Sequence, residues 1–277
     1  MPDLTIHSES AGRGTPILLF VHAWCADGTD WRHQRAHFEK AHRVLTCDRR
    51  GHGASKGIVD ALDLQTAGSD VANLLADDER APLVLIGHGM GCRVVLEAAQ
   101  RVSNPLVGVV LIDGDRLVAG NPDQAVEETR RQYADIGFGK FRDALLEGMF
   151  TGDADPARKA EIIARARRVS ESVAEAYWCS MLRWDAAAVE GALKNLRAPL
   201  LVLQSTYLSA EYKHFATDPR VLTPLLEVIG RLVPTVRIQT IEGVGHFPML
   251  DAADAVNRCI ATFLADATFR RFFESTL

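Results

Sequence analysis

Residues 83–91 read LVLIGHGMG, and this stretch decides the fold. An apolar run typical of a buried strand leads into a turn with glycine at positions 87, 89 and 91, and a helical pattern follows. Glycine lets a strand and a helix approach closely, and it adopts backbone conformations that other residues avoid. The stretch therefore predicts a sharp strand–turn–helix connection, with residue 89 at the tip of the turn and at the start of the helix.

Similar apolar runs on both sides of this turn predict further strands. They are rich in leucine and β-branched residues, as are strands that are covered on both faces of a parallel sheet. The runs are residues 17–21, 43–47, 83–86, 106–112 and 200–203. Val236, Ile238 and Thr240 alternate with polar residues, which predicts a strand nearer the sheet edge. Helical patterns separate the runs, so we expect an α/β fold with a mostly parallel, doubly wound sheet.

Residues 116–195 break this alternation, because they show helical patterns and no convincing strand. The stretch is rich in alanine, arginine and glutamate, and it contains two tryptophans, Trp178 and Trp184. Its position between two predicted strands indicates a helical lid inserted in the core. We therefore expect a core of residues 1–115 and 196–277 and a lid of residues 116–195.

The composition is that of a globular protein and limits the classes of partner. Of the 277 residues, 47% are hydrophobic and 24% are charged, and the net charge is −5. An acidic balance argues against nucleic acid or an anionic membrane as a partner, and no apolar run reaches the roughly 20 residues of a membrane helix. The five cysteines form no C-x-x-C pair, and the first residues show no signal pattern. We expect a cytoplasmic protein with free thiols.

Four motifs occur in the order in which the α/β-hydrolase superfamily has them, and the chain resembles that superfamily. ILLFVHAWC (17–25) is similar to its strand and oxyanion turn, and RVLTCDRRGHGAS (43–55) is similar to its strand followed by D-x-R-G-H-G-x-S. The turn 87–91 is similar to the nucleophile elbow G-x-S-x-G, and GHFP (245–248) to the segment of the catalytic histidine. The resemblance covers nearly the whole chain outside the lid and implies the α/β-hydrolase fold.

The resemblance also implies where the catalytic groups lie. Gly89 takes the position of the nucleophile, and His246 that of the catalytic histidine. The backbone N–H groups of Trp24 and Met90 would form the oxyanion hole. His88, beside the elbow, is commonly histidine in this superfamily and is interpreted as supporting structure.

The acid of the triad requires a choice between strand ends. Many relatives carry it after the strand that here is 200–203, but no carboxylate follows that strand before Glu211. The strand 106–112 ends directly before Asp113, and some α/β-hydrolases place the acid there. We assign Asp113, with Asp115 and Glu211 as alternatives. Its role would be to fix the tautomer of His246 and to stabilise the imidazolium.

The aromatic residues predict a small apolar or aromatic molecule as the substrate. Trp24, Trp178, Trp184 and Phe247 are the candidates for binding it, although the lid tryptophans have packing within the lid as an alternative role. No dinucleotide or phosphate loop and no metal-ligand spacing occurs, so we expect neither a cofactor nor a metal. The sequence leaves the oligomeric state open, with a homodimer as one expectation.

Glycine at position 89 departs from the family pattern, because it has no atom that can attack a substrate. Cys25 and Cys92 lie nearby in sequence, but neither occupies the tip of the turn. In a first interpretation the parent is a serine hydrolase of esters, lactones or carbon–carbon bonds, and Gly89 replaces its serine. In a second, His246 and Asp113 act as a base without a covalent intermediate, as in lyases and in cofactor-independent quinolone dioxygenases, which however keep the serine. In a third, the chain only binds a small molecule.

Overall fold

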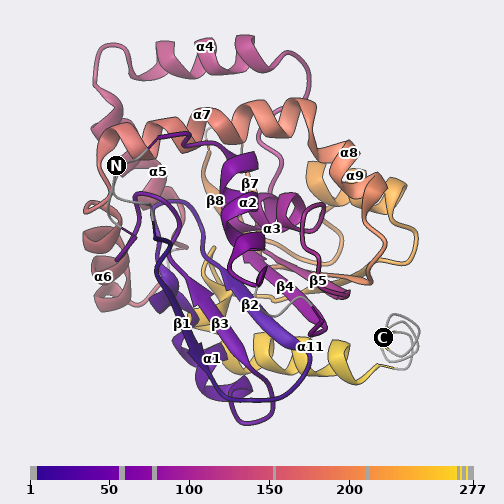
Figure 1. The fold of residues 1–277 in the computed structure, drawn as a ribbon. Coiled ribbons are helices and arrows are strands. Elements are labelled where there is room, and N and C mark those ends of the chain that lie inside the picture. The colour runs from indigo at the N-terminus through magenta and orange to yellow at the C-terminus, as the bar shows by residue number, and fades with distance from the viewer. Residues whose placement is uncertain are drawn as a thin grey trace.

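The apolar runs form one seven-stranded sheet in the order β1-β3-β2-β4-β5-β6-β9 (Figure 1). The computed structural model describes residues 5–55, 60–76, 80–151, 154–209, 212–266, 269 and 273. Neighbouring strands are parallel except for β1 and β3, which are antiparallel. The prediction of a mostly parallel, doubly wound sheet is confirmed. The strands are β1 (Ser8–Ala11), β2 (Ile17–Val21), β3 (Val44–Cys47), β4 (Leu83–His88), β5 (Leu106–Ile112), β6 (Leu200–Gln204) and β9 (Arg237–Thr240).

Helices cover both faces of the sheet, which explains the continuous apolar runs of its central strands. Every residue of β2 and β4 is buried. On one face α2 (Leu64–Asn73) packs against α3 (Met90–Ala98), and on the other lie α1 (Arg32–Phe38) and α11 (Ala253–Ala265) (Figure 1). The strand β9 lies at the sheet edge, as the sequence predicts, but its burial does not alternate, because Ile238 and Gln239 are both exposed.

Five helices lie between β5 and β6, and no strand is found in the described part of this stretch. They are α4 (Pro122–Tyr133), α5 (Phe138–Gly148), α6 (Pro156–Ala166), α7 (Glu171–Ala187) and α8 (Val189–Asn195). Three begin at polar caps, because the side chains of Asn121, Asp155 and Ser170 accept hydrogen bonds from N–H groups of the first turn. The longest, α7, contacts α4 and α5 on one side and α2 and α3 of the core on the other.

Two features of the fold could not be predicted from the sequence. Strand β1 has the sequence SESA, and its side chains are mostly exposed, so it has no apolar pattern. A hairpin of β7 (Thr206–Leu208) and β8 (His214–Ala216) follows β6 directly and forms a separate two-stranded sheet. The remaining elements are the 3-10 turn η1 (Gly28–Trp31), α9 (Pro224–Leu232) and α10 (Pro248–Asp251). Among the described residues, no helix combines the length and the apolar character that a membrane crossing requires.

Candidate active site

The turn between β4 and α3 is built for close approach. A Cβ atom on Gly87 would lie 2.3 Å from the carbonyl oxygen of Gly91, and one on Gly91 would lie 2.3 Å from that of Val21. Both positions therefore exclude any larger residue. Gly89, at the tip, has φ 53° and ψ −115°, in the left-handed half of backbone space that glycine adopts without strain.

The ring of His246 faces this tip. A Cβ atom on Gly89 would lie 3.0 Å from Nε2 of His246 and 3.1 Å from Cβ of Ala23. The basic nitrogen of the imidazole is therefore directed at the place where the side chain of a nucleophile would begin. Positions 89 and 246, which two separate sequence motifs predict as parts of the site, are neighbours in the structure.

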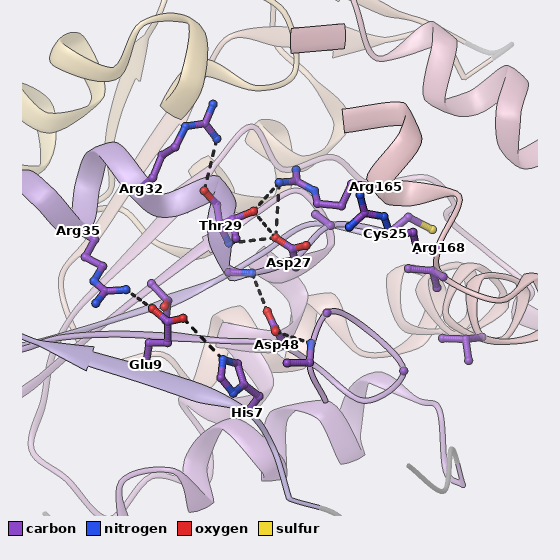
Figure 2. Close-up of a pocket in the computed structure, with 18 of the residues that line it drawn as sticks. His7, Glu9, Cys25, Asp27, Thr29, Arg32, Arg35, Asp48, Arg165 and Arg168 are labelled. Carbon is purple, nitrogen blue, oxygen red and sulfur yellow. Dashed lines mark hydrogen bonds and ion pairs between the residues drawn. The ribbon is translucent and has the colours of Figure 1, made fainter. Parts of the chain in front are cut away.

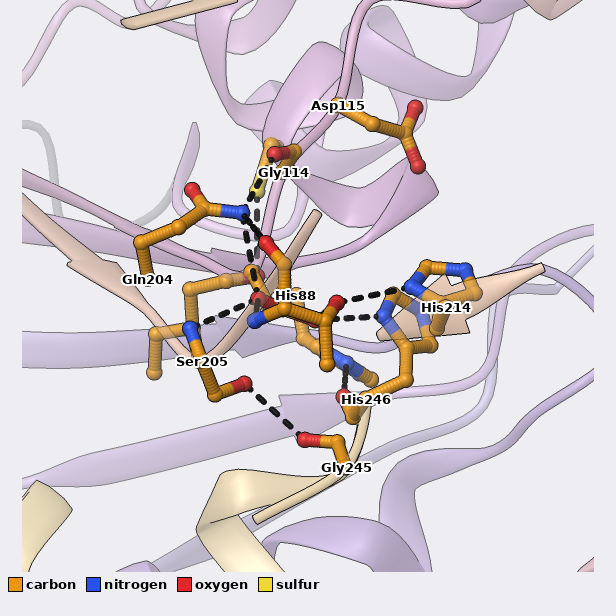
Figure 3. A network of polar contacts seen from close by, with 12 residues as sticks. His88, Gly114, Asp115, Gln204, Ser205, His214, Gly245 and His246 are labelled. Atoms are coloured by element: carbon orange, nitrogen blue, oxygen red, sulfur yellow. Dashed lines mark hydrogen bonds and ion pairs between the residues drawn. The ribbon is translucent and has the colours of Figure 1, made fainter. Parts of the chain in front are cut away.

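Asp113 holds the other nitrogen of His246, with Oδ2 2.8 Å from Nδ1 (Figure 3). Asp113 follows β5 and has a positive φ of 44°, a strained conformation for a residue other than glycine. Its Oδ1 accepts hydrogen bonds from the backbone N–H groups of Ser205 (2.8 Å) and Thr206 (2.7 Å) and from the side chain of Gln204 (3.1 Å). Its Oδ2 also accepts one from Thr206 Oγ1 at 2.6 Å. Burial raises the pKa of Asp113 above its usual value, and these hydrogen bonds fix the carboxyl group and oppose that shift.

The environment of His246 favours a neutral ring. Burial lowers its pKa to about 4, so that the imidazole is unprotonated at neutral pH. The carboxylate of Asp113 accepts the proton on Nδ1, which leaves the lone pair on Nε2. A neutral imidazole with Nε2 free is the form that accepts a proton in general-base catalysis.

The two alternative acids have different positions. Asp115 accepts a hydrogen bond on Oδ1 from Nη2 of Arg93 at 2.6 Å, and this arginine also pairs with the buried Asp185. Asp115 therefore serves an ion-pair network and not His246. Glu211 lies outside the described residues.

Two further histidines touch His246. Nε2 of His88 lies 2.6 Å from the carbonyl oxygen of His246 and so ties the histidine loop to the elbow. The ring centroid of His214, on β8, lies 4.2 Å from that of His246, and its Nδ1 lies 2.7 Å from Thr206 Oγ1. Sequence reasoning missed His214, because a short hairpin carries no pattern that places it here. Ligating atoms of Asp113, His214 and His246 lie within 4.8 Å of one another, but hydrogen bonds within the network already use these groups.

The predicted oxyanion donors flank Gly89. Met90 is the first residue of α3, so its N–H has no acceptor within its own helix and the positive end of the helix dipole lies there. Trp24 lies in the turn after β2, and the preceding Ala23 carbonyl accepts a hydrogen bond of 2.6 Å from Nη2 of the buried Arg49. Arg49 also lies 5.3 Å from the ring centre of Tyr177 on α7. This arginine holds the oxyanion turn in place, a role that the motif did not reveal.

A narrow cavity adjoins Nε2 of His246. Its volume is about 30 Å³, which is room for one or two water molecules. The charged and imidazole side chains in its wall are Arg93, Asp115, His214 and His246, and most of the other side chains are apolar or aromatic. The lining residues are Trp24, Gly89, Met90, Arg93, Asp115, Leu117, Leu145, Met149, Trp178, Met181, Leu208, Tyr212, His214 and His246.

A larger and more open cleft lies elsewhere, beside β1 and α1 (Figure 2). Its volume is about 1270 Å³, and neither Gly89 nor His246 lines it. Charged side chains pair with one another across it. Arg165 from α6 contacts Asp30 and also donates a hydrogen bond of 2.7 Å to Thr29 Oγ1. These contacts attach the helical segment to the core.

Comparison with known proteins agrees with this geometry. A family model described as the alpha/beta hydrolase family matches residues 18–258. The chain belongs to the α/β-hydrolase family. The match runs through the elbow, the acid strand and the histidine loop, and the resemblance inferred from the four motifs is confirmed.

Relatives within the α/β-hydrolase family have several activities. The chain is 25% identical over 259 residues to the non-heme chloroperoxidase CPO-A1 of Kitasatospora aureofaciens, covering 85% of this chain and 86% of that one. It is 24% identical over 268 residues to the bifunctional esterase/perhydrolase DCH of Acinetobacter calcoaceticus, covering 91% and 92%. The fold is similar to that of the enol-lactonase from Burkholderia xenovorans LB400, with a TM-score of 0.72, 23% identity and coverage of 94% and 96%.

Of the aromatic residues predicted to bind substrate, two line the cavity of this α/β-hydrolase. Trp24 and Trp178 are in its wall, and their ring centroids lie 5.3 Å apart. Trp184 is not in the wall, because its Nε1 donates a hydrogen bond of 2.6 Å to Glu97 on α3. Phe247 is not there either, because it stacks on Phe150 behind the histidine loop, with 5.3 Å between ring centroids. Substrate binding by these two residues stays a prediction, and in this structure both side chains pack outside the cavity wall.

The two nearby cysteines do not take the place of a nucleophile. Burial raises the pKa of both thiols, that of Cys25 to about 12. Sγ of Cys92 lies 3.3 Å from the carbonyl oxygen of Gly87 and faces the strand. A buried thiol that stays protonated is a poor nucleophile, so neither replaces the side chain that Gly89 lacks.

Proposed function

We propose that the chain is an enzyme in which His246, oriented by Asp113, acts as a general base on an apolar small molecule without a covalent enzyme intermediate. One observation carries this proposal. Nε2 of His246 faces the place where the side chain of a nucleophile would begin at Gly89, and Nδ1 of the same ring pairs with Asp113. His246 is therefore placed to take a proton from water or from the substrate, because residue 89 has no side chain that could donate one.

The neighbours of Gly89 lie close to it. A side chain at position 89 would place its Cβ atom 3.0 Å from His246 and 3.1 Å from Ala23, closer than ordinary carbon contacts, so one of these neighbours would have to retreat. A serine would require a shift of a few tenths of an ångström in His246 or Ala23, and we take the glycine that is present as the working residue. A protein that only binds a ligand would have no need of a buried Asp–His pair with four further donors on the carboxylate.

Hydrolysis of an ester or lactone suits this arrangement and the activities of the relatives. Nε2 of His246 takes a proton from water, and the resulting hydroxide attacks the carbonyl carbon. The N–H groups of Trp24 and Met90 stabilise the tetrahedral oxyanion. The imidazolium then returns the proton to the leaving oxygen as the carbon–oxygen bond breaks. The cavity has room for the water, and helices α5 and α7, which supply much of its apolar wall, act as the lid that moves to admit the substrate.

A second candidate is removal of a proton from the substrate itself. His246 would produce an enolate or phenolate, and the same N–H groups would stabilise it. The carbanion form would then react with molecular oxygen or expel a leaving group, as cofactor-independent dioxygenases and lyases of this fold do. The aromatic wall of Trp24 and Trp178 favours this candidate for an aromatic substrate.

The test is a paired assay of the chain and its Gly89→Ser variant on short-chain aryl esters, enol lactones and enolisable aromatic ketones with oxygen uptake followed. We expect the Gly89 chain to turn over a member of this panel. We expect the variant to be no faster, because its side chain crowds Nε2. A fluorophosphonate, which labels activated serines, tests the same point: we expect the variant to stay unlabelled, and rapid labelling would show that His246 activates a serine there. An inert Gly89 chain and an ester turnover that serine raises by several orders of magnitude would refute the proposal.

The pH profile of the same reaction provides a second prediction. The pKa of His246 is lowered to about 4 by burial, so Nε2 is free to accept a proton at all pH values well above 4. We expect kcat/KM to be constant between pH 6 and 8 and to fall as the pH drops through the value for His246. A profile that follows an ordinary histidine, with half of the activity lost near pH 6.5, would contradict a buried base.

A further inference from the structure

His214 is a second imidazole in the wall of the same cavity. It lies on β8, is half-buried, and its ring centroid is 4.2 Å from that of His246 (Figure 3). The hairpin that carries it follows β6, the strand after which many relatives carry the acid of the triad. In this chain the residues after β6 include Ser205 and Thr206, which donate hydrogen bonds to Asp113, and then His214, which contacts Thr206.

The hydrogen bonds determine which nitrogen of His214 is protonated. Thr206 Oγ1 has one proton and donates it to Oδ2 of Asp113 over 2.6 Å. It must therefore accept from Nδ1 of His214, which is 2.7 Å away. Nε2 of His214 then carries a lone pair, and it has no hydrogen-bond partner among the residues that the structure describes. Burial, and repulsion from the ring of His246 where that ring is protonated, lower the pKa of His214 to about 3, so the ring of His214 stays neutral.

The wall of the cavity thus has two imidazoles, His214 and His246, each with an Nε2 that can accept a hydrogen bond. Their polar counterparts are the N–H groups of Trp24 and Met90, and the buried Nε1 of Trp178, which has no partner within the described chain. A ligand that matches these groups presents an oxygen acceptor to the N–H groups and hydrogen-bond donors to the two imidazoles. An ester or ketone without further polar groups would leave His214 unpaired.

We propose that His214 binds the substrate through Nε2, and that the substrate carries a second hydroxyl or N–H group beside its reacting group. This rests on the proposed function, since it assumes that the cavity beside His246 is the substrate site. The substrate class is then a small apolar or aromatic molecule with two neighbouring donors. His214 acts as a determinant of specificity, in addition to its contact with Thr206.

Two variants separate binding from structural support. Asparagine carries its amide nitrogen at the position of Nδ1 of histidine, so His214→Asn keeps a donor for Thr206 and removes the acceptor at Nε2. His214→Gln keeps a polar end at the position of Nε2 and loses the contact with Thr206. His37→Asn, at an exposed histidine of α1, controls for the general loss of an imidazole.

The experiment measures binding and not turnover, so its outcome is independent of the paired assay at position 89. Dissociation constants of phenol, catechol and resorcinol are determined by NMR titration under anaerobic conditions. We expect at least one diol to bind the unaltered chain and His37→Asn about two- to tenfold more tightly than phenol does, as one further hydrogen bond provides. We expect His214→Asn to lose this difference and His214→Gln to keep part of it. The proposal is overturned if neither diol binds the unaltered chain more tightly than phenol, or if His214→Asn retains the difference.

Discussion

Replacement of His246 by alanine is expected to lower kcat/KM of the Gly89 chain by about 1000-fold, since a positioned general base contributes roughly 10²- to 10⁴-fold. The loss should be nearly complete because no other described side chain presents a basic nitrogen at Gly89. His214 lines the same cavity, but its Nδ1 is directed at Thr206, and the atoms nearest to a Cβ at position 89 belong to His246 and Ala23. The measurement is steady-state turnover of the compound from the panel that the Gly89 chain processes.

Two controls make the His246 result specific. The exposed His37→Ala should keep full activity, because that side chain lies on the far helix α1. Added imidazole should restore part of the activity of His246→Ala, because the truncation leaves a space of the right shape beside Gly89. A variant that keeps more than a tenth of the activity would show that the reaction does not depend on this base.

Much of the fold could be predicted because its signals are local. The central strands are covered on both faces, so they appear in the sequence as continuous apolar runs. The elbow has glycine at 87 and 91 because a Cβ atom there would collide with backbone oxygens. Strand β1 could not be found in this way, because it lies at the edge of the sheet and its polar side chains are exposed. Its pairing with β3 depends on backbone hydrogen bonds, which any sequence can form.

In the site, too, some residues could be predicted from the sequence and others could not. Asp113 and His246 follow strand ends and could be placed by position along the chain, while their separation of 2.8 Å appears only in three dimensions. The residues that support them come from a hairpin of three-residue strands without periodicity, so Thr206 and His214 could not be identified. Trp184 and Phe247 are predicted as binding residues from their position in the sequence alone, and neither lines the cavity beside His246. A buried aromatic residue can serve the packing of the fold as well as ligand binding. Here Trp184 donates a hydrogen bond to Glu97, and Phe247 stacks on Phe150.

The Asp113→Asn variant is expected to reduce kcat/KM by about 10⁴-fold, as in the triad where the corresponding amide leaves the geometry intact and imposes the wrong tautomer. In the structure Oδ2 of Asp113 accepts from both Nδ1 of His246 and Oγ1 of Thr206, while Oδ1 accepts from two backbone N–H groups. Asparagine can leave its oxygen at the backbone donors only by placing its NH₂ group at the position of Oδ2. That group is a donor, so His246 must turn its unprotonated nitrogen toward it.

The consequence for His246 can be observed directly. In Asp113→Asn the proton of the neutral imidazole moves to Nε2, so the nitrogen that faces Gly89 becomes a donor and cannot accept a proton. Nitrogen-15 NMR of the histidine rings should show Nδ1–H in the parent chain and Nε2–H in the variant, and Asp123→Asn, at an exposed residue of α4, should change neither tautomer nor rate. A variant with the parental tautomer and unchanged turnover would mean that Asp113 is only a structural anchor of the hairpin. A changed tautomer with lost activity would connect the buried carboxylate to catalysis through the one atom, Nε2, on which the proposed chemistry depends.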